Sequence, residues 1–112
     1  MDTLFTKIIN KEIPAKIFYE DSQVLAFHDT APMAPVHFLV IPKKPIRNLN
    51  ELTEGDKVLA GHILFIAQRL ALEQGCEKGF RVVVNCNEDG GQTIYHIHMH
   101  VLGKRQMNWP PG

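Results

Sequence analysis

Residues 95–102 read Tyr95-His96-Ile97-His98-Met99-His100-Val101-Leu102, which places three of the six histidines at every second position. Successive side chains of a β-strand point to opposite faces of the sheet. We therefore expect a strand here, with the three rings on one face and apolar side chains on the other. Buried polar rings are costly without hydrogen-bond partners, so the row indicates a face that carries chemistry.

Length and charge limit the class of protein. The chain has 112 residues and no net formal charge, which predicts a single domain over residues 1–112 and no nucleic-acid partner. No apolar run approaches the roughly 20 residues that span a bilayer, and the N-terminus lacks a signal-peptide layout. Cys76 and Cys86 are not spaced as a disulfide framework. We expect a soluble cytoplasmic protein without disulfides or a membrane partner.

Apolar residues at helical spacing predict two helices. A short one, capped by Asp2 or Thr3, runs to about Asn10. A long one opens at Thr53 and ends before Gly75, a residue type favoured just beyond a helix. His62 lies among polar neighbours of this helix and is expected to be exposed.

The remaining apolar stretches predict strands at 17–20, 23–29, 36–41 and 80–85, the first two forming a hairpin. Together with the histidine strand they make five. Mostly short connections and one long helix indicate an α+β fold with an antiparallel sheet.

Three chemistries compete for the histidine row. Zinc takes tetrahedral nitrogen ligands, but His96 and His100 are separated by roughly 13 Å along a strand, so a metal would need a further ligand such as His37. A structural row of rings that donate to backbone carbonyls is the second reading. The third, which we favour, is catalysis by a neutral imidazole nucleophile with neighbouring rings handling protons. We expect no metal.

The loop from Asn87 to Thr93 directly precedes the histidines and favours a phosphate ligand. Gly90 and Gly91 allow the backbone to approach an oxyanion closely, and successive N–H groups can form an anion nest. An ordinary hairpin turn is the alternative. Elsewhere, Asp29 could chelate a ribose diol or cap a turn, and His37 could pair with another histidine or be a satisfied core ring.

The sequence resembles the histidine triad (HIT) family, whose motif of three histidines alternating with apolar residues is matched by residues 96–102. Within it, the chain resembles the Hint branch of nucleoside phosphoramidases, through Phe27-His28-Asp29, residues 35–44, Val83-Val84-Asn85, Gly90-Gly91-Gln92 and the tail 106–112. The resemblance implies an antiparallel five-stranded α+β subunit with one long and one short helix, which dimerises into a ten-stranded sheet.

The resemblance also implies a reaction, the hydrolysis of the P–N bond in purine nucleoside 5′-phosphoramidates without a metal or other cofactor. By matched position, His98 is the nucleophile, His96 and His100 position phosphate and handle protons, and His37 supports them. The other implied nucleotide contacts are Asp29, Thr30, Asn85, Gly91, Gln92, Thr93 and Met99, a base pocket of Phe5, Ile8, Ile13, Phe27 and Leu39, and Trp109, which would approach the partner's site. A nucleotide-binding scaffold with incidental hydrolysis is the alternative. Diadenosine polyphosphate hydrolysis is disfavoured by the chain length and the tail.

Two residues depart from the family pattern. Thr93 stands where many relatives have serine, which keeps the hydroxyl but stiffens χ1. Lys104 stands where glycine is common after Gly103, so we expect strain if that position needs a positive φ.

Overall fold

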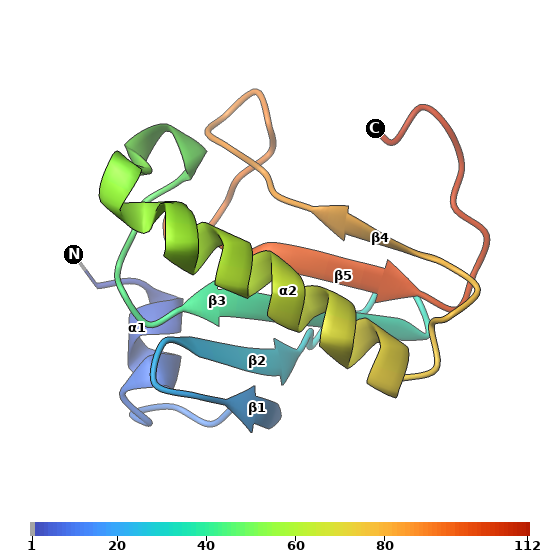
Figure 1. Cartoon of the computed structure of the whole chain (residues 1–112), viewed down its shortest axis with the longest axis horizontal. Helices are drawn as coiled ribbons and strands as arrows, with labels where there is room; N and C mark the ends of the chain where they lie inside the picture. Colours follow the sequence, from blue (N-terminus) through green and yellow to red (C-terminus); the bar gives the residue numbers. More distant parts are fainter. Residues whose placement is uncertain (1) are drawn as a thin grey trace.

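The computed structural model describes residues 2–112. The elements, in chain order, are α1 (Leu4–Ile9), β1 (Ile17–Glu20), β2 (Val24–His28), β3 (Val36–Pro42), the 3-10 turns Leu49–Glu51 and Glu54–Asp56, α2 (Lys57–Glu73), β4 (Phe80–Val83) and β5 (Met99–Gly103). The strands form one antiparallel sheet in the order β1-β2-β3-β5-β4. Helix α2 lies across one face of this sheet (Figure 1). The expected α+β fold with five antiparallel strands is confirmed.

Strands β2 and β3 carry apolar side chains on both faces because each face of the sheet is covered by a helix. On β2, Val24 and Ala26 pack against α2, whereas Leu25 and Phe27 pack against Phe5 and Ile8 of α1. The same alternation on β3 sends Phe38 and Val40 toward α2, and Leu39 and Ile41 toward α1. Burying one such side chain contributes about 1.5–3 kcal/mol. The sheet therefore has an α2 face and an α1 face.

Both helix starts follow their capping residues. The Thr3 side chain accepts the N–H of Phe5, and Thr53 forms a capping box with Asp56. The first turn after Thr53 is a 3-10 turn, so α2 itself begins at Lys57, four residues later than expected. Gly75 follows the helix with φ +84°, a conformation that favours glycine.

The expectation that His62 is exposed was wrong. Its side chain is 29% exposed, and Nε2 lies 2.8 Å from Oδ2 of Asp21, in the turn between β1 and β2. The contact ties the hairpin turn to α2. Polar neighbours along the helix did not indicate this, because the partner comes from another part of the chain.

The histidine strand is shorter than predicted. β5 begins at Met99, so His96 and His98 precede the strand. The backbone diverges because the carbonyl of Pro42, at the end of β3, accepts from the His96 ring at 2.7 Å, while the N–H of Ile97 donates to the carbonyl of Ile46. β4 likewise ends at Val83 and not at residue 85.

No helix within residues 2–112 is both long and apolar enough to cross a membrane.

Candidate active site

Four histidine rings gather beside the α1 face of the sheet. His37 lies on β3 and His100 on β5, whereas His96 and His98 belong to the segment that leads into β5. The ring centroids of His98 and His100 are 5.0 Å apart, and those of His37 and His100 are 5.3 Å apart. The predicted common side of the three rings therefore holds in space, although only His100 lies within the strand.

The hydrogen bond of His98 leaves one ring nitrogen available for chemistry. Its Nδ1 lies 2.8 Å from the carbonyl oxygen of His96. A carbonyl can only accept, so Nδ1 carries the proton and Nε2 carries the lone pair. The edge-on ring of Phe5, 5.0 Å away between centroids, packs against the imidazole. Burial lowers the pKa of His98, which keeps the ring neutral at pH 7.

His96 supports this geometry from behind. It is 2% exposed, and its Nε2–H donates to the carbonyl of Pro42 at 2.7 Å. Burial lowers its pKa as well. The ring anchors the segment before β5 to the end of β3, and this anchor places the His96 carbonyl that orients His98.

His37 and His100 form a second hydrogen-bonded pair. The N–H of Met33 donates to Nδ1 of His37 at 3.0 Å, so neutral His37 carries its proton on Nε2. That nitrogen lies 3.0 Å from Nδ1 of His100 and 3.4 Å from Oδ2 of Asp29. The chain of donors leaves the proton of His100 on Nε2. Burial, reinforced by His98 and His37, lowers the pKa of His100 to about 4.

Asp29, His37 and His100 are also the one group among residues 2–112 whose ligand atoms converge as a metal site would require, all within 4.8 Å of one another. A neutral imidazole that binds a metal through Nε2 must carry its proton on Nδ1. Nδ1 of His37 already accepts the N–H of Met33. The donor pattern therefore fits a proton-transfer chain better than a metal site.

A cavity of about 380 Å³ opens between α1 and these rings. That volume lies within the range of small-molecule sites. His98 and His100 line it, together with the sequence-predicted residues Phe5, Ile8, Ile13, Phe27, Asp29, Thr30, Leu39, Asn85, Gly91 and Thr93. The lining thus combines apolar side chains with a carboxylate, hydroxyls and imidazoles. Asp29 combines both of the roles considered for it, because Oδ1 accepts the N–H of Ala31 in a turn while the residue lines the cavity.

The glycines of the loop are required by geometry. A Cβ on Gly90 would lie 2.5 Å from the carbonyl oxygen of Cys86, and Gly91 has φ +79°. Gln92 is buried, and its amide accepts the N–H of Asn87 while donating to the carbonyls of Arg47 and Ile94. Gln92 therefore holds the loop in shape and does not line the cavity.

Four other predicted site residues lie outside the cavity lining. His37 and His96 stand behind the lining rings, Met99 packs on the α2 face, and Trp109 is 82% exposed on the tail. The cavity also includes Leu4, Pro14, Ala15, His28 and Ile94, which sequence reasoning did not select. Apolar residues around the end of α1 carry no local signal that separates a pocket wall from a core.

The fold and the site define an α+β protein in which His98 and His100 line a mostly apolar cavity. The sequence profile of the HIT domain matches residues 10–107, so the chain belongs to the HIT family. An uncharacterised HIT-like protein of Synechococcus elongatus is 54% identical over 99% of this chain and 97% of its own. A HIT family hydrolase from Legionella pneumophila has a TM-score of 0.96 at 50% identity, covering 99% of this chain and 100% of its own. A histidine triad protein from Clostridium difficile has a TM-score of 0.90 at 40% identity, covering 96% and 97%.

Proposed function

We propose that this protein is a cytoplasmic hydrolase of the Hint branch, which cleaves the P–N bond of purine nucleoside 5′-phosphoramidates such as adenosine 5′-monophosphoramidate or AMP–lysine. One observation carries the proposal. The ring of His98, whose Nδ1–H donates to the His96 carbonyl, lines the same cavity as Asp29 and the apolar residues around Phe5 and Phe27. A nucleophile, a site for ribose and a site for a base are thereby joined in one cavity.

The reaction has two steps that balance in protons. In the first, the Nε2 lone pair of His98 bonds to phosphorus, the P–N bond breaks, and the leaving amine nitrogen takes up one proton. In the second, water attacks phosphorus, the bond to His98 breaks, and the water gives up one proton as the 5′-monophosphate leaves. Covalent catalysis of this kind divides one difficult displacement into two easier ones.

His100 is the group best placed to serve the phosphoryl oxygens. With its pKa near 4, the ring is neutral at pH 7 and presents Nε2–H as a hydrogen-bond donor. Such a donor stabilises negative charge that grows on phosphoryl oxygens in the transition state. The Thr93 hydroxyl and the backbone of Gly91 line the same cavity and can add further donors.

The nucleoside half of the substrate would bind the apolar part of the cavity lining and the nearby carboxylate of Asp29. The ring centroids of Phe5 and Phe27 are 5.5 Å apart in an edge-to-face arrangement. Together with Leu39 they form an apolar part of the lining against which a purine can pack. Asp29, at the end of β2, can accept hydrogen bonds from ribose hydroxyls through the carboxylate oxygen that does not cap the turn.

The decisive experiment looks for the covalent intermediate. The protein is mixed briefly with adenosine 5′-monophosphoramidate, the reaction is quenched, and the mass of the intact protein is measured by mass spectrometry. We expect one adenylyl adduct, absent in His98→Ala, whose turnover falls by orders of magnitude while its circular dichroism is unchanged. His62→Gln, a change at a histidine outside the cavity, should keep both adduct and turnover. Turnover by His98→Ala at the wild-type rate would overturn the mechanism.

The alternative function is a nucleotide-binding scaffold in which hydrolysis is incidental. It predicts saturable AMP binding by calorimetry together with no adduct and no turnover of any phosphoramidate in a panel of amine leaving groups. The orientation of His98 favours the enzyme, because binding alone does not require a ring nitrogen with its lone pair held ready.

We further propose that the protein acts as a homodimer with a continuous ten-stranded sheet. Within residues 2–112, β4 is an edge strand that pairs only with β5, and such an edge can pair with a second copy. On α2, the exposed residues Val58, Phe65 and Leu72 repeat at seven-residue spacing and therefore share one side of the helix. A Cβ added to Gly61, on the same stripe, would meet no atom within 4 Å, which leaves room for close approach.

Light scattering after gel filtration tests the assembly. We expect twice the chain mass for the wild type and a shift to the monomer in Phe65→Asp, a change that spares the core because Phe65 is 54% exposed. A monomeric wild type would contradict the dimer. If the dimer forms, Trp109→Ala should raise KM, because the resemblance places this tail residue near the partner's site.

A further inference from the structure

The backbone of Met33 is held on both sides of its Cα. Its N–H donates to Nδ1 of His37 at 3.0 Å, and its carbonyl accepts from Nε of Arg105 at 2.9 Å. The side chain of Met33 is 69% exposed, so burial does not fix this loop in place. Two polar contacts, one from β3 and one from the tail, therefore fix the two peptide planes that meet at the Cα of Met33.

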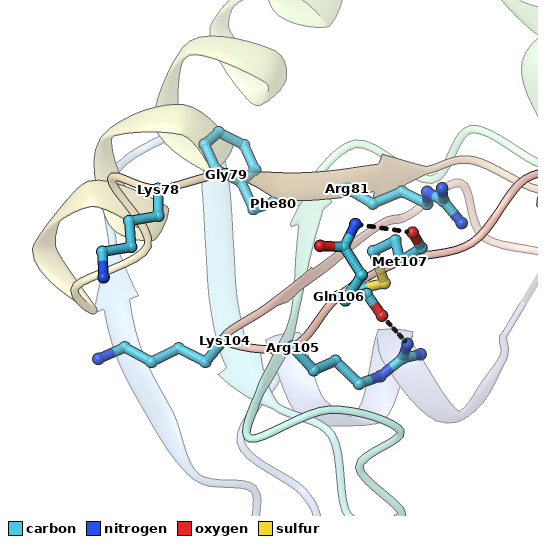
Figure 2. A pocket seen from close by; sticks show the side chains of 8 residues that line it. All are labelled: Lys78, Gly79, Phe80, Arg81, Lys104, Arg105, Gln106 and Met107. Atoms are coloured by element: carbon cyan, nitrogen blue, oxygen red, sulfur yellow. Dashed lines mark hydrogen bonds between the residues drawn. The ribbon is translucent and has the colours of Figure 1, made fainter.

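The backbone at the end of β5 aims Arg105 at this loop. Gly103 is the last residue of the strand and pairs with Val36, which follows the loop of Met33. Lys104 then adopts φ +70° and turns the chain. Arg105 also donates through a terminal nitrogen to the carbonyl of Gln106 at 3.1 Å, as Figure 2 shows. The guanidinium thus bridges the tail and the loop.

The N–H of Met33 selects between two arrangements of the histidine pair. With the proton on Nε2, His37 accepts from Met33 and donates to His100, which must then present Nε2–H to a ligand. With the proton on Nδ1, His37 would point an N–H at the N–H of Met33, and His100 would present a lone pair. The carboxylate of Asp29, 3.4 Å from Nε2 of His37, favours the first arrangement as well.

We propose that Arg105 is a positioning residue, which acts through the backbone conformation of Met33 to hold His37 and His100 in the arrangement that offers a donor to the phosphoryl group. The carbonyl lies in the peptide plane that follows the Cα of Met33 and the N–H in the plane that precedes it, so a hydrogen bond to the carbonyl restricts backbone rotation at Met33 and keeps the N–H aimed at His37. The effect on turnover rests on the proposed function, whereas the effect on the proton positions does not.

Arg81 supplies a matched control. It lines the same cavity of about 550 Å³ as Arg105, among the cationic side chains of Lys78 and Lys104 (Figure 2). Like Arg105, it donates from its guanidinium to a backbone carbonyl, that of Asn108 at 2.8 Å. Arg81→Ala therefore removes the same charge and a similar bond without touching the loop of Met33.

The direct test is nitrogen-15 NMR of the histidine rings in the full chain at neutral pH without ligand. We expect His37 and His100 to carry their protons on Nε2 in the wild type and in Arg81→Ala. In Arg105→Ala the Nδ1-protonated form of both rings should rise measurably, with Arg105→Lys in between. Unchanged ring signals in Arg105→Ala, or an equal change in Arg81→Ala, would overturn the proposal.

Kinetics supply the second readout. We expect Arg105→Ala to lower kcat by about threefold to tenfold, the scale of one weakened hydrogen bond, with little change in KM. A change in KM alone would contradict a role through His100. A wild type without phosphoramidase activity would refute the proposed function, and the ring signals would still decide the role of Arg105.

Discussion

His98 donates through Nδ1 to the carbonyl of His96, two residues earlier in the chain, across 2.8 Å. This bond makes the central histidine different from its neighbours, because it leaves the Nε2 lone pair beside the cavity. In His96, by contrast, Nε2–H donates to the carbonyl of Pro42. In His100, Nδ1 accepts from His37, so Nε2–H is available to a ligand.

The first prediction concerns the pH dependence of turnover. Only neutral His98 has a lone pair to offer, and burial lowers its pKa below the ordinary 6.5. We therefore expect the acid limb of kcat/KM to be centred below pH 6.5. Initial rates, corrected for the acid lability of the substrate without enzyme, provide the check. An acid limb centred above pH 6.5 would contradict the structure.

The second prediction concerns acid stability. His100 has a folded-state pKa of about 4, below its unfolded value of 6.5, so the folded chain binds fewer protons between these limits. Its contribution to stability is complete above pH 6.5 and is lost as the pH falls toward 4, by roughly 3 kcal/mol. Urea unfolding at several pH values measures the slope. His100→Gln should flatten it, and an unchanged slope would speak against a buried neutral ring.

Asp29 offers a test of ribose recognition. Asp29→Asn keeps an oxygen for the N–H of Ala31 but removes the charge beside His37. If the carboxylate also holds the ribose hydroxyls, the substitution and a 2′,3′-dideoxy substrate should each raise KM by about tenfold, and together by little more. Fully additive losses would show that Asp29 acts elsewhere.

Metal removal should have no effect. Because Met33 donates to Nδ1 of His37, the Asp29, His37 and His100 group is arranged for proton transfer. Dialysis against a chelator should leave turnover within about twofold. Loss of activity that returns with zinc would mean that His37 changes its tautomer to bind the ion.

Lys104 provides a prediction about stability. It adopts φ +70°, so the strain expected at this departure from the family pattern is present. Lys104→Gly should stabilise the fold by about 0.5–1 kcal/mol, measured by urea unfolding. Gly103→Ala is the contrasting change, since its Cβ would lie 2.5 Å from Sγ of Cys76 and should destabilise. Destabilisation by Lys104→Gly would mean that the lysine side chain contributes more than the strain costs.

The periodic parts of the chain could be predicted from sequence. Strands with apolar residues on both faces, such as Val36–Pro42, indicate a sheet that is covered on both faces. The apolar residues at helical spacing in Lys57–Glu73 indicate one covering helix. The alternation of His96, His98 and His100 correctly placed the rings on one side. These features depend on the spacing of apolar and polar residues along the chain, which can be read directly from the sequence.

Sequence reasoning allowed His37 to pair with another histidine, but it identified neither the partner nor the other hydrogen bonds between distant segments. His37 meets His100 across 63 residues, and Arg105 reaches Met33 across 72. The late start of the histidine strand, at Met99, likewise follows from the carbonyl of Pro42, which accepts from a ring nitrogen of His96. The sequence alone determined which side chains could do chemistry and that they share a face. Only the tertiary structure decided which ring nitrogen holds each proton, because the backbone groups that hydrogen-bond to the rings are brought there by the fold.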